Sequence, residues 1–519
     1  MSDPTTRQAG VSGMSLYLPR PRVSLEDWCD WTGNPADKIR AVVGTGFRCP
    51  DTNEDVYTMA ANAALRLIRQ YDLDPARIGF LALGTESSKD NSAGAIIVRG
   101  MLDRALQQLG RPALARDCEV PEFKHACLGG IYALKNAVRY ARAEGGDRLA
   151  IAIAADIAEY ERGSTGEQTQ GAGAVAMLVE SRARLFEIPL EEAGSASQYR
   201  GPDFRKPFRR HLLNGSLHRP ATALHDYPVF SGRYSTFAYL DETLWAVRSM
   251  AGKKDCSVGE LLDSAGAIFF HRPYHHMPLQ GLAYLWLDAL VAAGEAGAHE
   301  LASICEAAGV SSEQLVEELR SNPDLFGRLV SEGQPRDLYP AASAAAAKLR
   351  KTDAFRQYVA SKMGLGTETA REFGNLYSAS LPAWLAAGLE EAWQAGRDLS
   401  GAGVLAIGYG SGDAAEALSL RVVPQWQEAA AHLDVASAME GAIDLTREQY
   451  EALHDHRALQ PLDYPRANEF VITQIGSNHD TDFQDLGIDY YEFVEANPLG
   501  DNAAEFELDT TSGRVHVSN

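Results

Sequence analysis

Short apolar runs, each ending in a small polar turn, alternate with amphipathic stretches along this chain of 519 residues. The runs at 78–83, 149–155 and 175–179 have the length and composition of buried strands. The stretches 56–71 and 130–144 carry apolar residues at helical spacing. Because strands and helices alternate, the sequence predicts an α/β fold with buried strands.

The second half of the chain repeats this rhythm without a strong sequence repeat. The expected elements are strands over 266–270 and 403–407 and helices over 278–292 and 380–395. Residues 293–372 read as a polar and alanine-rich helical insertion, with helices at 341–349 and 353–362. The alternating tail from about residue 466 predicts a terminal hairpin.

Charge and cysteine content exclude several classes of protein. The net charge of -22 opposes non-specific binding to nucleic acid or to an anionic membrane. No stretch approaches the roughly 18 apolar residues of a membrane span. The six cysteines show no disulfide spacing, and the N-terminus has no apolar signal core. We therefore expect a cytoplasmic protein that binds neither nucleic acid nor membrane.

One cysteine, Cys127, stands in a turn of small residues before an expected helix over 131–142. A thiolate at a helix N-terminus is stabilised by the helix dipole and by free amides, which predicts a lowered pKa. The same amides can hold a thioester oxyanion. Taken alone, the motif fits a nucleophile and a buried structural cysteine equally well.

Two further polar residues follow apolar strands. Glu86 stands where the run 78–83 meets a loop, and partial desolvation there would suit it to proton transfer, although a helix cap or a solvated loop acid is the commoner role. His271 is delivered to a proline turn and can donate a hydrogen bond to a carbonyl or exchange a proton. His275 and His276 are nearby, but no ligand frame accompanies them, so no metal site is predicted.

Two small-residue segments complete the set. Asn375, among small neighbours, can orient an oxygen through its amide. The sequence 408–412 is an amide-rich turn after a strand, without the frame of a phosphate loop. We interpret 171–173 as a glycine turn that precedes the strand 175–179.

Seven strings in order make the chain resemble the 3-hydroxy-3-methylglutaryl-CoA synthase family of the thiolase-like superfamily. They are GTESS, AC-x-GG, DIAEY, EQTQGAGAVAM, FFHRPY, GNLYSAS and GYGSGDAAE. The resemblance runs from about residue 14 to 425 and includes the polyketide β-branching homologues, the HMG-ACP synthases.

The resemblance implies a thiolase-like, five-layered αβαβα fold made of two related halves. The N-terminal half would span 10–200 and the C-terminal half 201–430, with the helical insertion 293–372 inside it. Residues 431–519 would form a C-terminal extension with terminal strands. A homodimer is expected by the same analogy.

The resemblance also implies an acyltransferase reaction. Cys127 would accept an acetyl group from acetyl-CoA, which is a substrate, and no cofactor would be bound permanently. Glu86 would remove a proton from the acetyl methyl, and the resulting carbon would attack the ketone of an acetoacetyl thioester polarised by His271. Hydrolysis would then release the product.

Other positions of the family's substrate site also match. The amides of Cys127 and Ser411 would hold the oxyanion, and the remaining substrate-binding residues would be Tyr160, Thr169, Ser235, Asn375 and Tyr377. His276 stands where the family has a lysine that contacts the CoA phosphates, and Gln280 and Gly281 stand where another is common. Their loss leaves Arg205 and Lys206, followed by Arg209 and Arg210, as expected phosphate partners.

The missing lysines leave the acceptor open. The first hypothesis is condensation of acetyl and acetoacetyl groups carried on CoA, in a mevalonate-type pathway. The second is the β-branching reaction of polyketide assembly on an acyl carrier protein. A ketosynthase III-like enzyme would use Cys127, His271 and Asn375 but would need no acid at position 86. A catalytically idle protein is disfavoured because the residues for the reaction are all present, namely Glu86, Cys127, His271 and Asn375. Leu128 and Ile131 depart from the family's usual residues, so the acyl chain also stays open.

Overall fold

A ten-stranded mixed sheet runs through the molecule. The computed structural model describes residues 8–90, 93–201, 203–206, 227–334, 336–458, 460–496, 505–509 and 514–518. The strand order is β10-β11-β12-β8-β1-β7-β6-β4-β5, and β9 pairs with β12. The strands are β1 (Gly10–Tyr17), β4 (Ile78–Gly84), β5 (Glu122–Phe123), β6 (Leu149–Ala158), β7 (Gly171–Glu180), β8 (Phe186–Glu187), β9 (Gly194–Ser197), β10 (Ala265–Phe270), β11 (Gly403–Gly410) and β12 (Ala414–Val422).

Each half contributes its own part of this sheet, and the short β8 connects them. On one side β4 is parallel to β5 and β6, and β7 runs antiparallel to β6 and β1. On the other side β10 and β11 are parallel, and β12 is antiparallel to β11. The parallel strands deliver the ends of β4 and β6 to one edge of the sheet, where functional side chains gather.

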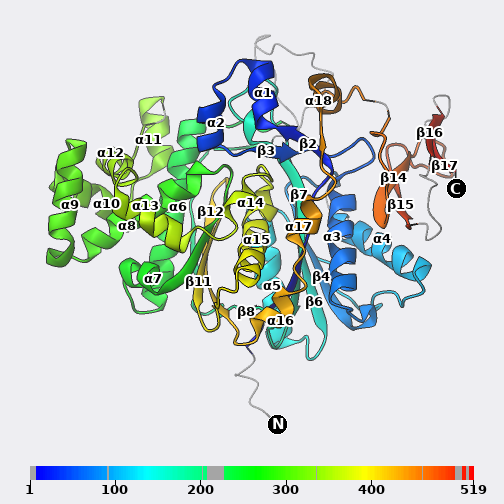
Figure 1. Cartoon of the computed structure of the whole chain (residues 1–519), viewed down its shortest axis with the longest axis horizontal. Helices are drawn as coiled ribbons and strands as arrows, with labels where there is room; N and C mark the ends of the chain where they lie inside the picture. Colours follow the sequence, from blue (N-terminus) through cyan, green and yellow to red (C-terminus); the bar gives the residue numbers. More distant parts are fainter. Residues whose placement is uncertain are drawn as a thin grey trace.

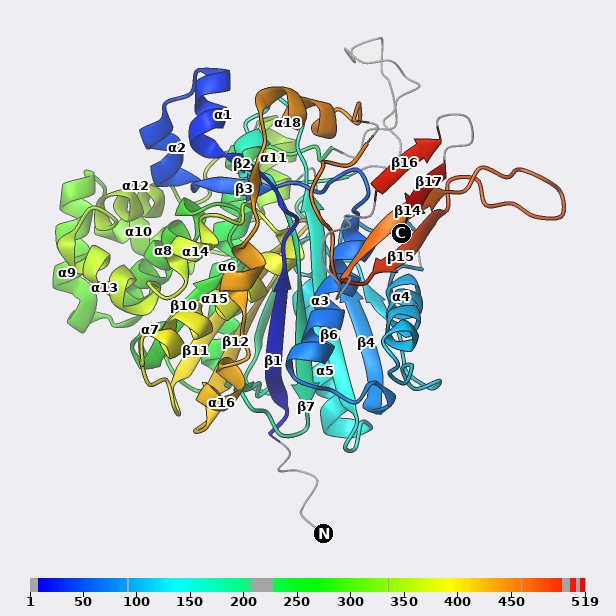
Figure 2. The same cartoon turned by 45° about the vertical axis from the view of Figure 1, so that its right-hand side comes forward.

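Five layers result from the way the helices pack on these strands (Figure 1). The outer helices α3 (Val56–Gln70) and α4 (Gly94–Gln108) cover one side, as Figure 2 shows beside β4 and β6. The central helices α5 (Gly129–Ala143) and α15 (Ser380–Gln394) lie between the two parts of the sheet. The other outer layer contains α6 (Gly232–Lys253), α7 (Val258–Ser264) and α8 (His276–Ala292). The predicted five-layer fold is confirmed.

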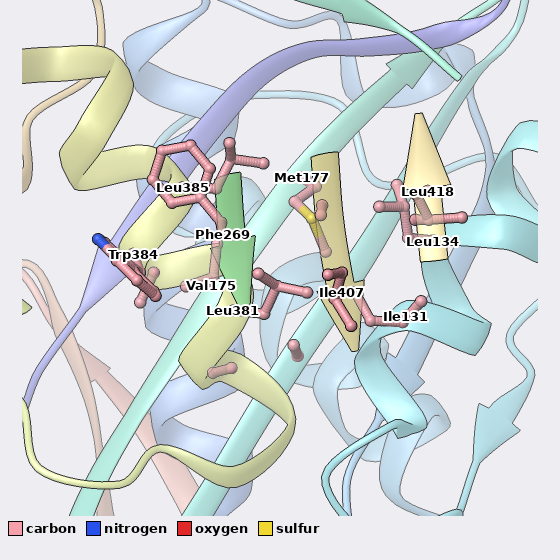
Figure 3. Packing of buried hydrophobic residues seen from close by; sticks show 14 of the residues in the cluster. Ile131, Leu134, Val175, Met177, Phe269, Leu381, Trp384, Leu385, Ile407 and Leu418 are labelled. Atoms are coloured by element: carbon pink, nitrogen blue, oxygen red, sulfur yellow. The ribbon is translucent and has the colours of Figure 1, made fainter. Parts of the chain in front are cut away.

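Buried apolar side chains pack around the central helices (Figure 3). Leu381 and Leu385 of α15 and Ile131 of α5 are at most 5% exposed. They pack with Met177 of β7 and Ile407 of β11, so both parts of the sheet bury apolar side chains against the same helix layer.

The predicted elements agree with the structure except at two glycine-rich segments. Of the turn predicted over 408–412, residues 408–410 are instead the last residues of β11. Each strand and helix expected over 56–83, 130–155 and 266–292 is present within a few residues of its predicted bounds. Residues 171–173, however, are not a turn but the first residues of β7. Gly173 is required there because a Cβ atom would lie 3.0 Å from the carbonyl oxygen of Tyr17 in the neighbouring strand segment.

The segment 293–372 is helical, as predicted, and packs on α8 (Figure 1). Its helices are α9 (Glu295–Ala308), α10 (Ser312–Arg320), α11 (Leu325–Glu332), α12 (Pro340–Leu349), α13 (Asp353–Lys362) and α14 (Thr367–Ala370). α12 and α13 confirm the helices expected at 341–349 and 353–362.

The remaining elements lie above and beside the main sheet. A small sheet joins β13, β2 and β3, and helices accompany it. These elements are β2 (Pro21–Ser24), β3 (Gly46–Arg48), β13 (Ile443–Asp444), α1 (Leu25–Thr32), α2 (Ala36–Val42), α16 (Trp426–Ala430), α17 (Val435–Met439) and α18 (Arg447–His454). In the tail, β14 (Glu469–Ile475) pairs antiparallel with β15 (Asp489–Val494), which confirms the predicted hairpin. β16 (Glu505–Asp509) and β17 (Arg514–Ser518) complete this sheet. Within the described ranges, no helix has the length and apolar character needed to cross a bilayer.

Candidate active site

Backbone contact between β4 and α5 places Cys127 at the edge of the sheet. A Cβ atom on Gly84 would lie 2.3 Å from the carbonyl carbon of Gly129, and one on Gly130 would lie 2.8 Å from the carbonyl oxygen of Ser378. Only glycine permits this approach. Ala126 has a positive φ of 41°, which turns the chain sharply before the cysteine. The small residues of the motif therefore hold the sulfur at the start of α5.

The thiol of Cys127 faces Glu86. Its Sγ donates to Oε2 of Glu86 at 3.9 Å, and the thiol residue is only 8% exposed. Burial raises the pKa of the Cys127 thiol well above its ordinary value, and the charges of Glu86 and Asp156 raise it further. The predicted lowering of this pKa is wrong, because desolvation and two nearby carboxylates outweigh the helix terminus. Cys127 therefore rests as a thiol that needs a base.

Asp156, at the end of β6, fixes the loop that carries Glu86. Its Oδ1 accepts the backbone N–H groups of Glu86 and Ser87 at 2.8 and 3.0 Å and the hydroxyl of Thr85 at 2.9 Å. Its Oδ2 accepts the N–H of Ser378 at 2.9 Å. One fully buried carboxylate thus joins the turn after β4 to the turn before α15.

His271 follows β10 and is neutral. Two backbone contacts fix its position. The backbone N–H of His271 donates to the carbonyl of Ile407 at 2.6 Å, and the backbone carbonyl of His271 accepts the hydroxyl of Tyr239 at 3.1 Å. Burial lowers the pKa of His271 to about 3. The imidazole can therefore donate a hydrogen bond to a carbonyl, whereas the proton exchange near neutral pH that the sequence also allowed does not fit. Its Nδ1 has no hydrogen-bond partner in the described part of the chain.

The segment that ends at Thr169 is hydrogen-bonded to the turn that carries Asn375 and Tyr377. The N–H of Asn375 donates to the carbonyls of Thr169 and Gln170 at 3.2 and 3.1 Å. The Asn375 side-chain oxygen accepts the N–H of Tyr377 at 2.9 Å and the hydroxyl of Ser380 at 3.1 Å. Tyr377 is fully buried with a positive φ of 44°. The amide of Asn375 is thus held in one orientation.

These side chains share one cavity of about 440 Å³. The predicted residues that line it are Cys127, Tyr160, Thr169, Ser235, His271, Asn375, Tyr377 and Ser411. Around Cys127 the wall is aromatic: the rings of Phe204 and Phe230 lie 6.4 and 5.3 Å from that of Tyr160. Such a wall excludes water from a reacting thioester.

The end of β11 closes the cavity near the cysteine. A Cβ atom on Gly410, the last residue of β11, would lie 2.8 Å from the carbonyl of His125 and 2.9 Å from the N atom of Leu128, so the end of this strand packs against the Cys127 turn. Ser411 follows Gly410 and lines the cavity. The arrangement is compatible with the expected amides of Cys127 and Ser411 as an oxyanion site.

A buried pair of carboxyl groups lies behind the cavity wall. The hydroxyl of Tyr409 contacts Asp203 at 3.2 Å and Asp413 at 2.8 Å. Burial, followed by the charge of Asp203, raises the pKa of Asp413 to about 9, so Asp413 is protonated near neutral pH. Ser235 donates its hydroxyl to Asp203. Its hydroxyl is therefore engaged by the protein.

Of the four residues expected to hold phosphate, Arg209 and Arg210 lie outside the described residues, and Arg205 and Lys206 lie in different surroundings. Arg205 is exposed, and its guanidinium contacts the carbonyl of Gly201 at 3.3 Å. Lys206 points inward, and its Nζ lies 3.7 Å from Oε1 of Glu86. His276, where the family has a lysine, accepts a contact from the side chain of Arg350 in the turn after α12.

The described residues contain no cluster of His, Cys, Asp and Glu suited to a metal ion. Cys127 and His271 line one largely apolar cavity, and Glu86, which is not among its lining residues, contacts the thiol of Cys127. Together they offer a nucleophile, a proton acceptor and a hydrogen-bond donor for a carbonyl, which are the groups required for covalent acyl transfer followed by carbon-carbon bond formation.

Sequence reasoning missed three features of this site. It did not identify Asp156 as the anchor of the Glu86 loop, although both residues follow parallel neighbouring strands and could have been paired on that basis. It also missed the carboxyl pair of Asp203 and Asp413, for which the sequence carries no signal. Lys206 was expected at a phosphate, yet it contacts Glu86.

Comparison with protein-family models finds two matches. The model "Hydroxymethylglutaryl-coenzyme A synthase N terminal" matches residues 5–184, and the model "Hydroxymethylglutaryl-coenzyme A synthase C terminal" matches residues 344–469. Together they cover more than half of the chain. The N-terminal match contains Glu86 and Cys127, and the C-terminal match contains Asn375.

Individual relatives agree with the family models. The chain is 28% identical to the hydroxymethylglutaryl-CoA synthase of Haloferax volcanii over 86% of this chain and 90% of that protein. It is 26% identical to the mitochondrial human hydroxymethylglutaryl-CoA synthase, over 81% and 75% of the two chains. Among solved structures, MvaS in complex with 3-hydroxy-3-methylglutaryl coenzyme A is similar, with a TM-score of 0.72, 26% identity and coverage of 94% and 99%.

More distant structures share the fold. PksG, an HMG-CoA synthase from Bacillus subtilis, has a TM-score of 0.66 at 17% identity, with 94% of this chain and 100% of that chain covered. The HMG synthase of the curacin pathway, solved with an acetyl donor-ACP, has a TM-score of 0.66 at 19% identity with the same coverage. The fold, the two family models and the relatives agree: this chain belongs to the hydroxymethylglutaryl-CoA synthase family.

Proposed function

We propose that this protein is an acyltransferase that condenses an acetyl group held on Cys127 with the ketone of an acetoacetyl thioester and then hydrolyses the product from the cysteine. In the first step the S–H bond of Cys127 breaks, a bond forms between Sγ and the acetyl carbon, and the proton passes to Glu86. The donor thiolate leaves and takes up this proton from Glu86, which returns to its ionised form. No resident cofactor takes part in this proposal.

In the second step Glu86 removes a proton from the acetyl methyl group. The electron pair of the broken C–H bond forms the new carbon-carbon bond to the ketone carbon. The ketone oxygen, which accepts a hydrogen bond from neutral His271, becomes a hydroxyl by gaining the proton that Glu86 took from the methyl group. Water then attacks the thioester on Cys127 and releases the acid and the free thiol.

One observation carries the proposal: the thiol of Cys127 donates to the carboxylate of Glu86 at 3.9 Å in a buried site next to the cavity lined by His271. A thiol with a raised pKa is mostly protonated, and Glu86 is placed to accept its proton. Glu86 also distinguishes the proposal from a ketosynthase III-like reaction, which would not use an acid at this position.

The proposal is tested by mixing the purified protein with acetyl-CoA and measuring the intact mass and the modified peptide. We expect one acetyl group on Cys127 and none on the Cys127→Ser variant. Cys256→Ser, which changes a partly exposed cysteine in a separate turn, is the matched control and should be acetylated like the wild type. A wild-type protein without acetyl-cysteine would overturn the proposal.

We propose CoA as the carrier of the acetoacetyl group. Relatives above 25% identity are named hydroxymethylglutaryl-CoA synthases, which supports this choice. The β-branching reaction on an acyl carrier protein is the second candidate, because His276 and Gln280 stand where the family has lysines. Offering acetoacetyl-CoA and an acetoacetyl carrier protein side by side discriminates them: faster turnover of the carrier-bound substrate would reverse our choice.

We further propose that the protein acts as a homodimer in the cytoplasm. The analogy with the family supports the dimer, and light scattering during size-exclusion chromatography measures it. All six cysteines are free, which agrees with a reducing compartment. A monomer that turns over substrate at the full rate would contradict the first part of this proposal.

A further inference from the structure

Lys206 brings a positive charge into the reaction centre. Its Nζ lies 3.7 Å from Oε1 of Glu86, and the lysine side chain is only 14% exposed. The ammonium also lies 5.3 Å from the centroid of the Tyr377 ring, at the position of a cation–π contact. Glu86 is therefore bracketed by two groups, the thiol of Cys127 at Oε2 and the ammonium of Lys206 at Oε1.

The described segment 203–206 is anchored around Lys206. Arg205 forms a two-way backbone bridge with Val229, with both N···O distances at 2.8 Å. Phe204 packs edge-on against the rings of Tyr160 and Tyr377, with centroid distances of 6.4 and 5.8 Å. These contacts hold the backbone of Lys206 beside the cavity. The inward direction of the Lys206 side chain is therefore set by the packing of its neighbours.

Lys206 is a positive charge close to two carboxylates and a thiol that must lose a proton. The carboxylates of Glu86 and Asp156 both disfavour a negative charge on Cys127, and Lys206 acts in the opposite direction. In a site this dry, a positive charge within 4 Å of a carboxylate favours its ionised form far more than it would in water. A base that must accept protons in both chemical steps has to start each step ionised.

We propose that Lys206 is a positioning residue for the reaction proposed above: its ammonium keeps the Glu86 carboxylate ionised and aimed at the sulfur of Cys127. Lys206 forms and breaks no covalent bond. During each proton transfer, negative charge leaves Glu86 and develops on the sulfur or on the acetyl carbon, while the ammonium stays beside the carboxylate that it contacts at 3.7 Å.

This role differs in a measurable way from the phosphate contact that the sequence suggests for Lys206. A phosphate contact acts on substrate binding and would raise KM for acetyl-CoA without altering the pH profile. A partner of Glu86 acts on the ionised fraction of the base. Its loss moves the acidic limb of the kcat profile to higher pH and leaves KM nearly unchanged.

The test compares Lys206→Met, which removes the charge and keeps a long side chain, with Lys206→Arg, which keeps the charge. Lys254→Met is the matched control, because Lys254 pairs with Glu192 at 2.5 Å, far from the cavity lining, and its loss changes the net charge equally. For each protein we would measure kcat and KM for acetyl-CoA from pH 5 to pH 10, the thermal midpoint, and acetylation of Cys127.

We expect the acidic limb of Lys206→Met to move up by about one pH unit or more, as for other carboxylates that lose a close cation. Below the limb, kcat then falls about tenfold per unit and recovers as the pH rises. Lys206→Arg should restore most of the wild-type profile, and Lys254→Met should coincide with it. If Lys206→Met does not fold, Lys206→Gln takes its place in the same measurements.

Two results would overturn the inference: a pH-independent loss of kcat, or a higher KM with an unchanged profile. Failure of the inference is distinguishable from failure of the proposed function. If the wild-type protein carries no acetyl group on Cys127, the proposed function fails. If the wild type is acetylated and condenses, yet Lys206→Met behaves like Lys254→Met, only the role of Lys206 fails.

Discussion

Asp156→Asn should destabilise the two turns that Asp156 holds together, and the loss in free energy of unfolding can be calculated from its hydrogen bonds. The carboxylate accepts two N–H groups and the hydroxyls of Thr85 and Ser87 at Oδ1 and the N–H of Ser378 at Oδ2. An asparagine can keep its oxygen toward the first set only, which turns its NH₂ group toward the N–H of Ser378. Two donors then face each other in a fully buried position.

The expected cost follows from the lost acceptor. A hydrogen bond to a charged group contributes about 1.5–3 kcal/mol, and leaving a buried N–H unsatisfied costs about 1–3 kcal/mol, so we expect a loss near 3 kcal/mol. With an unfolding entropy of about 2.1 cal/mol/K per residue, this corresponds to about 3 °C in the thermal midpoint of a protein of this length. Ser378 follows Tyr377, which lines the same cavity as Cys127, so a displaced Ser378 should also slow acetylation of Cys127.

Thr85→Val is the graded comparison. It removes one hydroxyl donor at 2.9 Å from the same carboxylate but leaves the N–H of Ser87 bonded to Asp156 at 3.0 Å. The Thr85 hydroxyl also accepts the N–H of Ser87 at 3.0 Å, so two hydrogen bonds disappear. We expect a loss of about 1 kcal/mol, since the N–H of Ser87 keeps its bond to Asp156 and no backbone group is orphaned. Differential scanning calorimetry measures both variants. Equal midpoints for Asp156→Asn and Thr85→Val would refute the assignment of Asp156 as the anchor of the two turns.

Two further outcomes are expected. Glu86→Ala should leave acetylation of Cys127 measurable, because it also removes a charge that raises the pKa of the thiol, but it should slow condensation by about 10²–10⁴-fold; product formation at the native rate would disprove the base assignment. His271 has a pKa of about 3 in the folded protein and about 6.5 when unfolded, so below pH 6.5 the unfolded chain binds a proton that the folded one does not. Stability is therefore lost as the pH falls from 6.5 towards 3, by about 2 kcal/mol at pH 5. Urea unfolding at pH 7 and pH 5 should show this loss in the wild type and a loss smaller by that amount in His271→Asn; equal losses would contradict the buried neutral imidazole.

Local pattern was sufficient for the elements and for the main chemical groups. Apolar runs with period and length typical of buried strands predicted β4, β6, β10 and β11, because side-chain burial follows directly from residue order along a strand. The same runs end at Glu86 and His271, and the glycines after Cys127 indicated the close turn that the structure contains. The residue types for acyl transfer could therefore be identified before their neighbours were known.

The tertiary structure alone decided how these groups behave. The sequence predicted a lowered pKa for Cys127, but burial and the carboxylates of Glu86 and Asp156 raise it. It placed Lys206 at a phosphate, yet the fold brings the lysine to Glu86. Desolvation and Coulomb interactions act through space and depend on which distant segments pack together, so residue order by itself carries no measure of them. The chain thus determined which groups are present, and the packing of its two halves determined their charge and their partners.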